Sequence, residues 1–368
     1  MLAGMGEEAT ATGGRRRARM AAASLLAAGI GALGGVLAWG AGLPMPFLLG
    51  AFAAMAAAGI AGFEPFGLRP ALPMGLRNLF VAVIGVMIGA TFRPGIFDSF
   101  ASLWLPLAGI ALFVPLAIGF NFLLFTRLGR FNAATAFYAG APGGLIDAIA
   151  LGETTGGDPR VIALQQFSRI AIVITALPFL FLLATGQKVG SAAGVSLAAP
   201  DTPLGWADGL ILIGAGLAGL YGGRALRLPA AILVGPLVLS AAVHYAGLTA
   251  AKPPLWVITL AQVMVGAGLG ARFGGFPARR LLRAWGLALL SVAGMLGIAA
   301  ALVALIAPIS GVPFKLLLIA FAPGGVTETA LIALSLDANP VFITTLHLFR
   351  ILLTVALSSG FARFLKEG

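Results

Sequence analysis

Two arginines occupy equivalent places in two similar apolar stretches of this chain. Arg169 and Arg350 each come ten residues after the proline of an Asp-Pro or Asn-Pro step. Such a step is a strong helix start, because the side chain caps free amides and proline fits the first turn. At 1.5 Å per residue, each guanidinium then originates about 15 Å along its helix. Where such a helix crosses a bilayer, a cation at that depth costs about 2.5–3.5 kcal/mol and requires a partner or a wet cavity.

Polar side chains accompany both arginines at matched distances. Gln166 and His347 precede them by three residues and therefore share their helix face. Asp147 and Glu328 lie farther upstream, each shortly after a Pro-Gly-Gly break in an apolar run. We expect the two breaks to be hairpin tips that reach the depth of the arginines, so that two carboxylates and two guanidinium groups meet there.

The breaks themselves offer a second kind of anion-binding group. Each tip contains a glycine pair, Gly143 with Gly144 and Gly324 with Gly325, and a new helical arm begins there. The start of an arm has free amide groups and the positive end of a helix dipole. Unwound backbone at mid-membrane depth has to be buried in protein or line a cavity.

These residues allow two interpretations. In the first, the tips with Arg169 and Arg350 hold the negative group of a solute, while Asp147 and Glu328 carry a coupling proton or cation. In the second, the two carboxylates simply neutralise the two arginines and hold the two halves of the chain together. Two ion pairs alone would not require two glycine-broken tips beside them, and we therefore favour the first.

The composition predicts a membrane protein. Hydrophobic residues make up 60% of the 368, charged residues 10%, and the mean hydropathy is +1.04. Globular chains average nearer a quarter charged, and apolar runs of about twenty residues recur along the whole chain. We therefore expect a polytopic helical membrane protein. The net charge of +11 comes from clusters between the runs, which indicates a positive-inside bias rather than nucleic-acid binding.

The same composition argues against metal chemistry. The chain has no cysteine and only two histidines, so a thiolate metal site or a copper or zinc enzyme is not expected. We predict no metal, no cofactor and no enzymatic activity. The basic residues 1–19 precede an apolar run that is too long for a cleaved signal peptide. This favours an uncleaved first span with a cytoplasmic N-terminus, and a cleaved signal peptide is the alternative.

The chain contains an internal duplication. The segment 141–170 resembles 322–351, and the segment 84–92 resembles 265–273, both at an offset of 181 residues. We therefore divide the chain into a basic N-terminus 1–19, a first repeat 20–185, a linker 186–204 and a second repeat 205–368.

The basic residues favour repeats of opposite orientation. Each repeat has six apolar runs, so six full spans would make the repeats parallel, whereas five spans plus a hairpin would invert them. Of the 23 Lys and Arg, Arg169 and Arg350 lie within spans. The inverted arrangement leaves only four of the other 21 outside the cell, namely Arg93, Lys188, Lys252 and Lys315. The predicted fold is an all-α polytopic protein with two inverted repeats, each of about five transmembrane helices plus one hairpin, and with both termini cytoplasmic. Whether each hairpin is re-entrant or a broken spanning helix stays open.

At these motifs the chain resembles the AbrB-duplication family of bacterial inner-membrane proteins. That family carries A-P-G-G-x-x-E, then G-x-D, then H-x-x-R in each half, and the resemblance covers nearly the whole chain after the basic N-terminus. Asp147 replaces the usual Glu, Gln166 the usual His, and Asn339 the usual Asp. The resemblance thus implies two half-sites that are not equivalent.

The resemblance also suggests activities. Family members are labelled ammonia monooxygenase or regulator of gene expression, and the family is distantly similar to inverted-repeat secondary transporters. We predict a proton-coupled secondary transporter of a small anionic or zwitterionic solute, whose partners are that solute and the lipid bilayer. The alternative is a membrane-embedded sensor that affects gene expression indirectly, without binding nucleic acid, and a membrane oxidoreductase ranks last. Self-association is left open.

Overall fold

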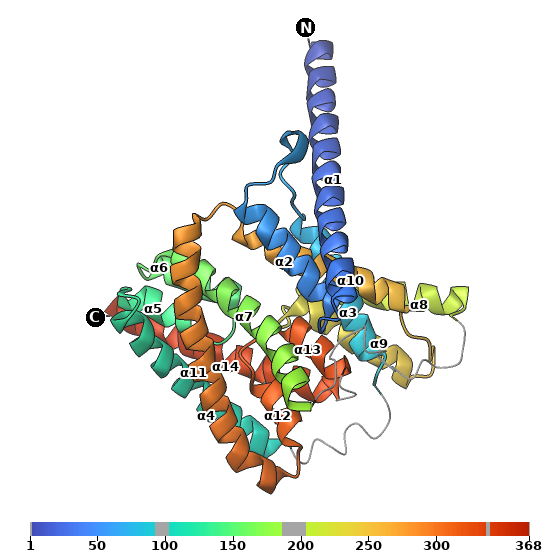
Figure 1. Cartoon of the computed structure of the whole chain (residues 1–368). Coiled ribbons are helices and arrows are strands. Elements are labelled where there is room, and N and C mark those ends of the chain that lie inside the picture. The colour runs from blue at the N-terminus through green and yellow to red at the C-terminus, as the bar shows by residue number, and fades with distance from the viewer. Residues whose placement is uncertain (1, 93–102, 186–203, 336–338, 368) are drawn as a thin grey trace.

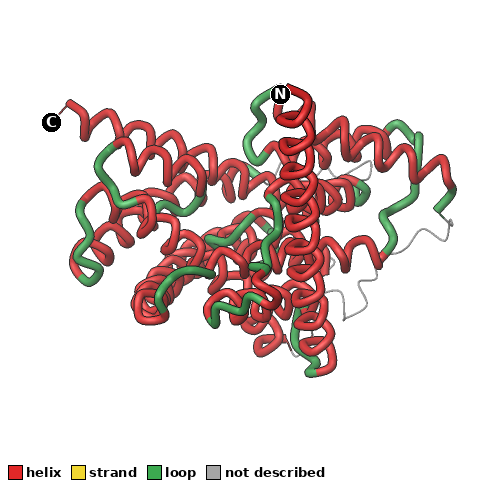
Figure 2. Tube along the Cα trace, turned by 90° about the horizontal axis from the view of Figure 1, so that it is seen from above, coloured by secondary structure: helices red, strands yellow, loops and turns green. Residues whose placement is uncertain are grey.

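The chain is helical wherever its structure is described. A computed structural model describes residues 2–92, 103–185, 204–335 and 339–367, and within these ranges it contains helices and loops but no strand (Figure 2). The all-α prediction is therefore confirmed. Apart from Leu204, the predicted linker lies outside the described residues.

The two halves contain helices in the same order. The helices of the first half are α1 (Leu2–Gly40), α2 (Pro46–Ile60), α3 (Met74–Gly89), α4 (Trp104–Arg127), α5 (Ala133–Gly140), α6 (Leu145–Thr154) and α7 (Pro159–Thr185). Those of the second half are α8 (Trp206–Ala225), α9 (Ala231–Tyr245), α10 (Leu255–Gly270), α11 (Ala278–Ser310), α12 (Phe314–Phe321), α13 (Val326–Ser335) and α14 (Pro340–Glu367). Short 3-10 turns follow α2 and α10, at Pro65–Gly67 and Ala271–Phe273.

Ten of these helices correspond to the predicted spans, and the four short ones, α5, α6, α12 and α13, to the two predicted hairpins. Among the described residues, six helical segments are long and apolar enough to cross a membrane: Arg16–Gly40, Trp104–Arg127, Pro159–Leu183, Leu255–Phe273, Arg279–Ser310 and Pro340–Arg363. The apolar helices α2, α3 and α9 have only 15 or 16 residues. The chain is thus consistent with a polytopic membrane protein, while its number of crossings and the inverted orientation stay predictions.

The helices gather into two groups, each of which draws on both halves of the chain (Figure 1). We call α1–α3 with α8–α10 the scaffold bundle, and α4–α7 with α11–α14 the hairpin bundle. In the scaffold bundle, α2 packs on α10 and α3 packs on α9, so the two halves interlock rather than lie apart. In the hairpin bundle, α4 packs on α11 and α14, and α7 packs on α11. The packing between the bundles involves mainly α3 with α13 and α14.

Glycines allow the interlocking helices to approach closely. A Cβ on Gly85 of α3 would lie 2.5 Å from the carbonyl oxygen of Leu233 on α9, and one on Gly266 of α10 would lie 2.3 Å from that of Leu48 on α2. Both distances are shorter than real Cβ contacts, so these positions need glycine. The repeated G-x-x-x-G pattern is therefore a site of helix packing in both halves.

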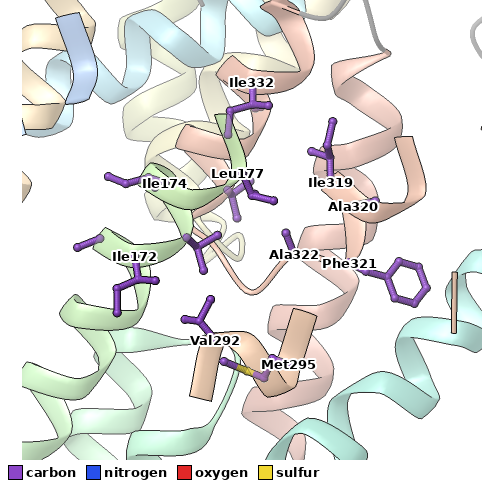
Figure 3. Packing of buried hydrophobic residues seen from close by; sticks show 14 of the residues in the cluster. Ile172, Ile174, Leu177, Val292, Met295, Ile319, Ala320, Phe321, Ala322 and Ile332 are labelled. Carbon is purple, nitrogen blue, oxygen red and sulfur yellow. The ribbon is translucent and has the colours of Figure 1, made fainter. Parts of the chain in front are cut away.

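The core of the hairpin bundle also combines residues from both halves. Figure 3 shows Ile172 and Leu177 of α7 beside Met295 of α11 and the end of α12 at Phe321 and Ala322. All five side chains are buried. The core therefore holds the end of the second hairpin's first arm against a helix of the first half.

Local capping explains where the hairpin and the following helix begin. The Asn132 side chain accepts a hydrogen bond of 2.8 Å from the Thr135 amide at the start of α5. The Asn132 side chain also donates to the Gly156 carbonyl, 2.9 Å away, just after α6 ends. The beginning of α5 and the end of α6 are thus adjacent, so the first break is a true hairpin and not a spanning helix with a kink.

Orientation can be tested with one matched pair of positions. Phe66 in the α2–α3 connection and Leu248 in the α9–α10 connection are both exposed and hold nearly equivalent places in the two halves. We expect an impermeant maleimide to label Leu248→Cys but not Phe66→Cys in intact cells, because inverted repeats put these connections on opposite sides. Equal labelling of both, in variants shown to insert and fold, would instead require parallel repeats.

Candidate functional site

The two arginines bind the hairpin tips of their own halves. Arg169 on α7 and Arg350 on α14 are buried, with 5% and 1% of their surfaces exposed. The Nη1 of Arg169 donates to the carbonyl of Ala141, and that of Arg350 to the carbonyl of Ala322. These acceptors are the residues before each Pro-Gly-Gly. The helix starts that set this depth are as predicted, since Asp158 and Asn339 accept hydrogen bonds from the first amides of α7 and α14.

Gln166 and His347 hold the same tips by equivalent bonds. The Gln166 Nε2 donates to the carbonyls of Tyr138 and Ala141, at 2.8 and 3.0 Å. The His347 Nε2 lies 3.1 Å from the carbonyl of Ile319, which is the counterpart of Tyr138 at the offset of 181 residues. Because a carbonyl only accepts, this nitrogen carries the proton. The other ring nitrogen, Nδ1, lies 3.3 Å from the Arg350 Nη2 and is left to accept.

Each tip also contacts the arginine-bearing helix of the opposite half, which is α14 for the first tip and α7 for the second. A Cβ on Gly143 would lie 3.3 Å from the Ile351 Cγ1 and 3.5 Å from the Thr354 Oγ1, both on α14. A Cβ on Gly324 would lie 2.9 Å from the Val173 Cγ1 on α7. Both tips therefore lie between α7 and α14.

The carboxylates do not neutralise the arginines. Among the residues that the structure describes, neither Asp147 nor Glu328 forms an ion pair with Arg169 or Arg350. The structure therefore gives no support to the ion-pair interpretation. The arginines instead bind backbone carbonyl oxygens, and the Nε of each is buried without a hydrogen-bond partner.

The two carboxylates, which occupy equivalent motif positions, have different surroundings. Glu328 is 4% exposed, and its Oε2 lies 2.0 Å from the point that a Cβ on Gly325 would occupy. Its carboxylate thus folds back over the start of α13. Asp147 is exposed, and its Oδ2 lies 3.4 Å from the corresponding point at Gly144. The two half-sites therefore differ, as the departures in sequence suggested.

One polar cluster beside the first hairpin has no counterpart in the duplicated motifs. Asn121 on α4 donates to the Gly140 carbonyl at 2.8 Å and accepts from Ser291 on α11 at 2.7 Å. This network joins the end of α5 to both halves. A single buried asparagine in an apolar run was the only sign of it in the sequence. Within the described ranges, no group of three His, Cys, Asp or Glu could hold a metal ion.

Comparison with known proteins identifies similar chains. Residues 47–366 match the family model described as "Transition state regulatory protein AbrB". The chain is 27% identical over 329 residues to the "Putative regulator AbrB" of Escherichia coli K12, covering 88% of this chain and 91% of the relative. It is 24% identical over 298 residues to the "Uncharacterized protein YhjN" of Bacillus subtilis 168, covering 77% of each.

Proposed function

The chain belongs to the AbrB family, and from that premise we propose that it is an inner-membrane secondary transporter that moves a small anionic or zwitterionic solute together with protons. The observation that carries the proposal is that the two duplicated hairpins have different environments in one molecule. Transport by alternating access needs two such environments, because a central site must open to one side and then to the other.

The second hairpin is closed against the scaffold bundle. Its arm α13 packs on α3 as well as on α7, α12 and α14. Thr327, near the tip, is only 8% exposed. The solute site is therefore covered on this side by contacts with α3.

The first hairpin is open. Its arm α6 packs on α5, α7 and α14, without comparable packing on α10, which is the counterpart of α3. Ile146, the counterpart of Thr327, is 78% exposed. With the predicted orientation, this is a state that is open to the cytoplasm.

The reverse state follows from the duplication. If α6 packed on α10 and α13 left α3, the open and closed hairpins would exchange roles. Two apolar grooves lie between the scaffold bundle and the hairpin bundle. One, of about 860 Å³, is between α2 and α7, and the other, of about 510 Å³, is between α9 and α14. Incomplete packing along these grooves leaves room for the bundles to shift as rigid bodies.

Thiol accessibility tests this proposal, and the chain's natural lack of cysteine removes any background. We expect Ile146→Cys to react quickly with a maleimide in native membranes. Thr327→Cys should react slowly but to completion, because a transporter passes repeatedly through the reverse state. Ala299→Cys, in the buried core of α11, controls for unfolding and should stay unreacted. If Thr327→Cys remains as unreactive as the control, the molecule has one state and is not a transporter.

The names of the relatives favour a second candidate, a membrane-embedded regulator that senses a solute without moving it. Such a sensor would bind the solute with both hairpins keeping their present environments. The same labelling experiment separates the two functions, since only transport requires Thr327→Cys to become accessible.

A further inference from the structure

We infer that the start of α6 binds a carboxylate group of the solute, and that Glu328 fills the duplicate position at the start of α13 with its own carboxylate. This inference uses the hairpin tip of the proposed function and narrows the solute to a small carboxylate. It concerns binding alone, so it can be tested whether or not the protein transports.

The first reason is a buried positive charge without a counter-ion. Among the described residues, Arg169 has a single hydrogen bond, to the Ala141 carbonyl, and no ion pair. Arg350 is better satisfied, with bonds to two carbonyls and to His347. A buried charge is costly unless it is paired, so the Arg169 half-site favours an anion.

The second reason is the open start of α6. The first amide to bond within this helix is that of Ala148, which donates to the Gly144 carbonyl at 2.7 Å. The amides of the preceding first turn therefore have no partner within the helix, and they carry the positive end of its dipole. Because Ile146 and Asp147 are exposed, no other part of the described chain covers this turn.

The third reason is the identity of the group in the duplicate position. Glu328 is buried and folds its carboxylate over Gly325, yet among the described residues this carboxylate has no hydrogen bond or ion pair. The chain itself thus places a carboxylate at one tip. At the other tip, Asp147 is one methylene shorter and lies farther from Gly144. In our inference, a carboxylate from the solute takes the place that the shorter Asp147 side chain does not fill.

The neighbours of the first tip limit the rest of the solute. A Cβ on Gly144 would lie 2.9 Å from the Val355 Cγ2, and Gly143 faces Ile351. A solute bound at this tip would therefore meet apolar side chains of α14. The Asp147 carboxylate is close enough to the same tip to meet an amino group, so a zwitterion with a carboxylate is accommodated as well.

The test compares two carboxylates with other anions on the purified full-length protein. Thermal unfolding is measured with propionate and with alanine, and with chloride and phosphate at equal ionic strength. We expect propionate or alanine to raise the unfolding temperature more than chloride or phosphate does. Stabilisation by phosphate alone, or by no anion beyond chloride, would overturn the carboxylate assignment.

Asp147→Glu provides the decisive variant, because it recreates the arrangement of Glu328. If the longer side chain occupies the tip nine-tenths of the time, the apparent affinity for the stabilising carboxylate falls about tenfold. Glu153→Asp, an exposed change at the other end of α6, is the matched control and should bind like the unmodified protein. Equal affinity in both variants would exclude the start of α6 as the site. If the protein binds a carboxylate but Thr327→Cys does not react, this inference stands and transport is rejected. If the protein binds no carboxylate but Thr327→Cys does react, transport stands and only this inference is rejected.

Discussion

Replacing Arg350 with Lys is expected to destabilise the protein more than the same change at Arg169. Arg350 donates to the carbonyls of Ala322 and Gly324 and also contacts His347, so three bonds depend on its planar fork. A lysine at the same depth keeps the charge but cannot reproduce these directions. Hydrogen bonds to charged groups contribute roughly 1.5–3 kcal/mol each, so losing two of the three costs at least about 3 kcal/mol. Thermal unfolding of both variants in detergent measures the difference.

The two arginines should also differ in what they do to binding. Because Arg169 has one bond to its hairpin and spare donors, Arg169→Lys is expected to lower carboxylate affinity while changing the unfolding temperature little. Arg350→Lys is expected to show the reverse pattern. If both variants lose stability equally and bind the carboxylate normally, the two half-sites do not differ in their contribution to stability or to binding.

Glu328→Gln is expected to abolish accumulation of solute under an imposed pH gradient. Glu328 is buried at the tip of the closed hairpin, with no counter-ion among the described residues, and a buried charge without a partner is costly. A glutamine keeps the shape but cannot take up a proton. Proteoliposomes with a membrane-impermeant carboxylate on both sides should still exchange it, because exchange needs no net proton movement.

Asp147→Asn serves as the comparison for this result. Asp147 is exposed, so removing its charge disturbs the protein less than removing the charge of the buried Glu328. We therefore expect a milder defect in accumulation than in Glu328→Gln. Accumulation that persists in Glu328→Gln at the rate of the unmodified protein would leave Glu328 as a structural residue. Loss of both accumulation and exchange would show a general defect and would also argue against a coupling role.

Several features of the fold could be predicted from the sequence because they depend on local interactions. Asp158 and Asn339 begin α7 and α14 through bonds to amides two or three residues away. Helical rise alone then sets the depth of Arg169 and Arg350. The register of the duplication predicted that both arginines and both hairpin tips would lie at a common depth, and the bonds to Ala141 and Ala322 have the same offset of 181 residues.

The partners and environments of these residues depended on contacts between distant segments. From the sequence, Asp147 and Glu328 were equally good partners for the arginines. In the folded chain, backbone carbonyls at the tips are closer, because the helix that carries each arginine packs directly on the arm that ends in the tip. No local pattern distinguishes a guanidinium that binds a carbonyl from one that binds a carboxylate.

The difference between the two hairpins was likewise decided only by tertiary structure. The sequence determined that the chain is helical and apolar, and it predicted a duplication in which two glycine-broken tips accompany two arginines. It could not determine that α13 packs on α3 while α6 lacks comparable packing on α10. The motifs are similar in the two halves, so the difference between their environments depends on how the two bundles dock. Docking is set by side-chain packing across surfaces that are remote in sequence, and it is this packing that buries Glu328 and leaves Asp147 exposed.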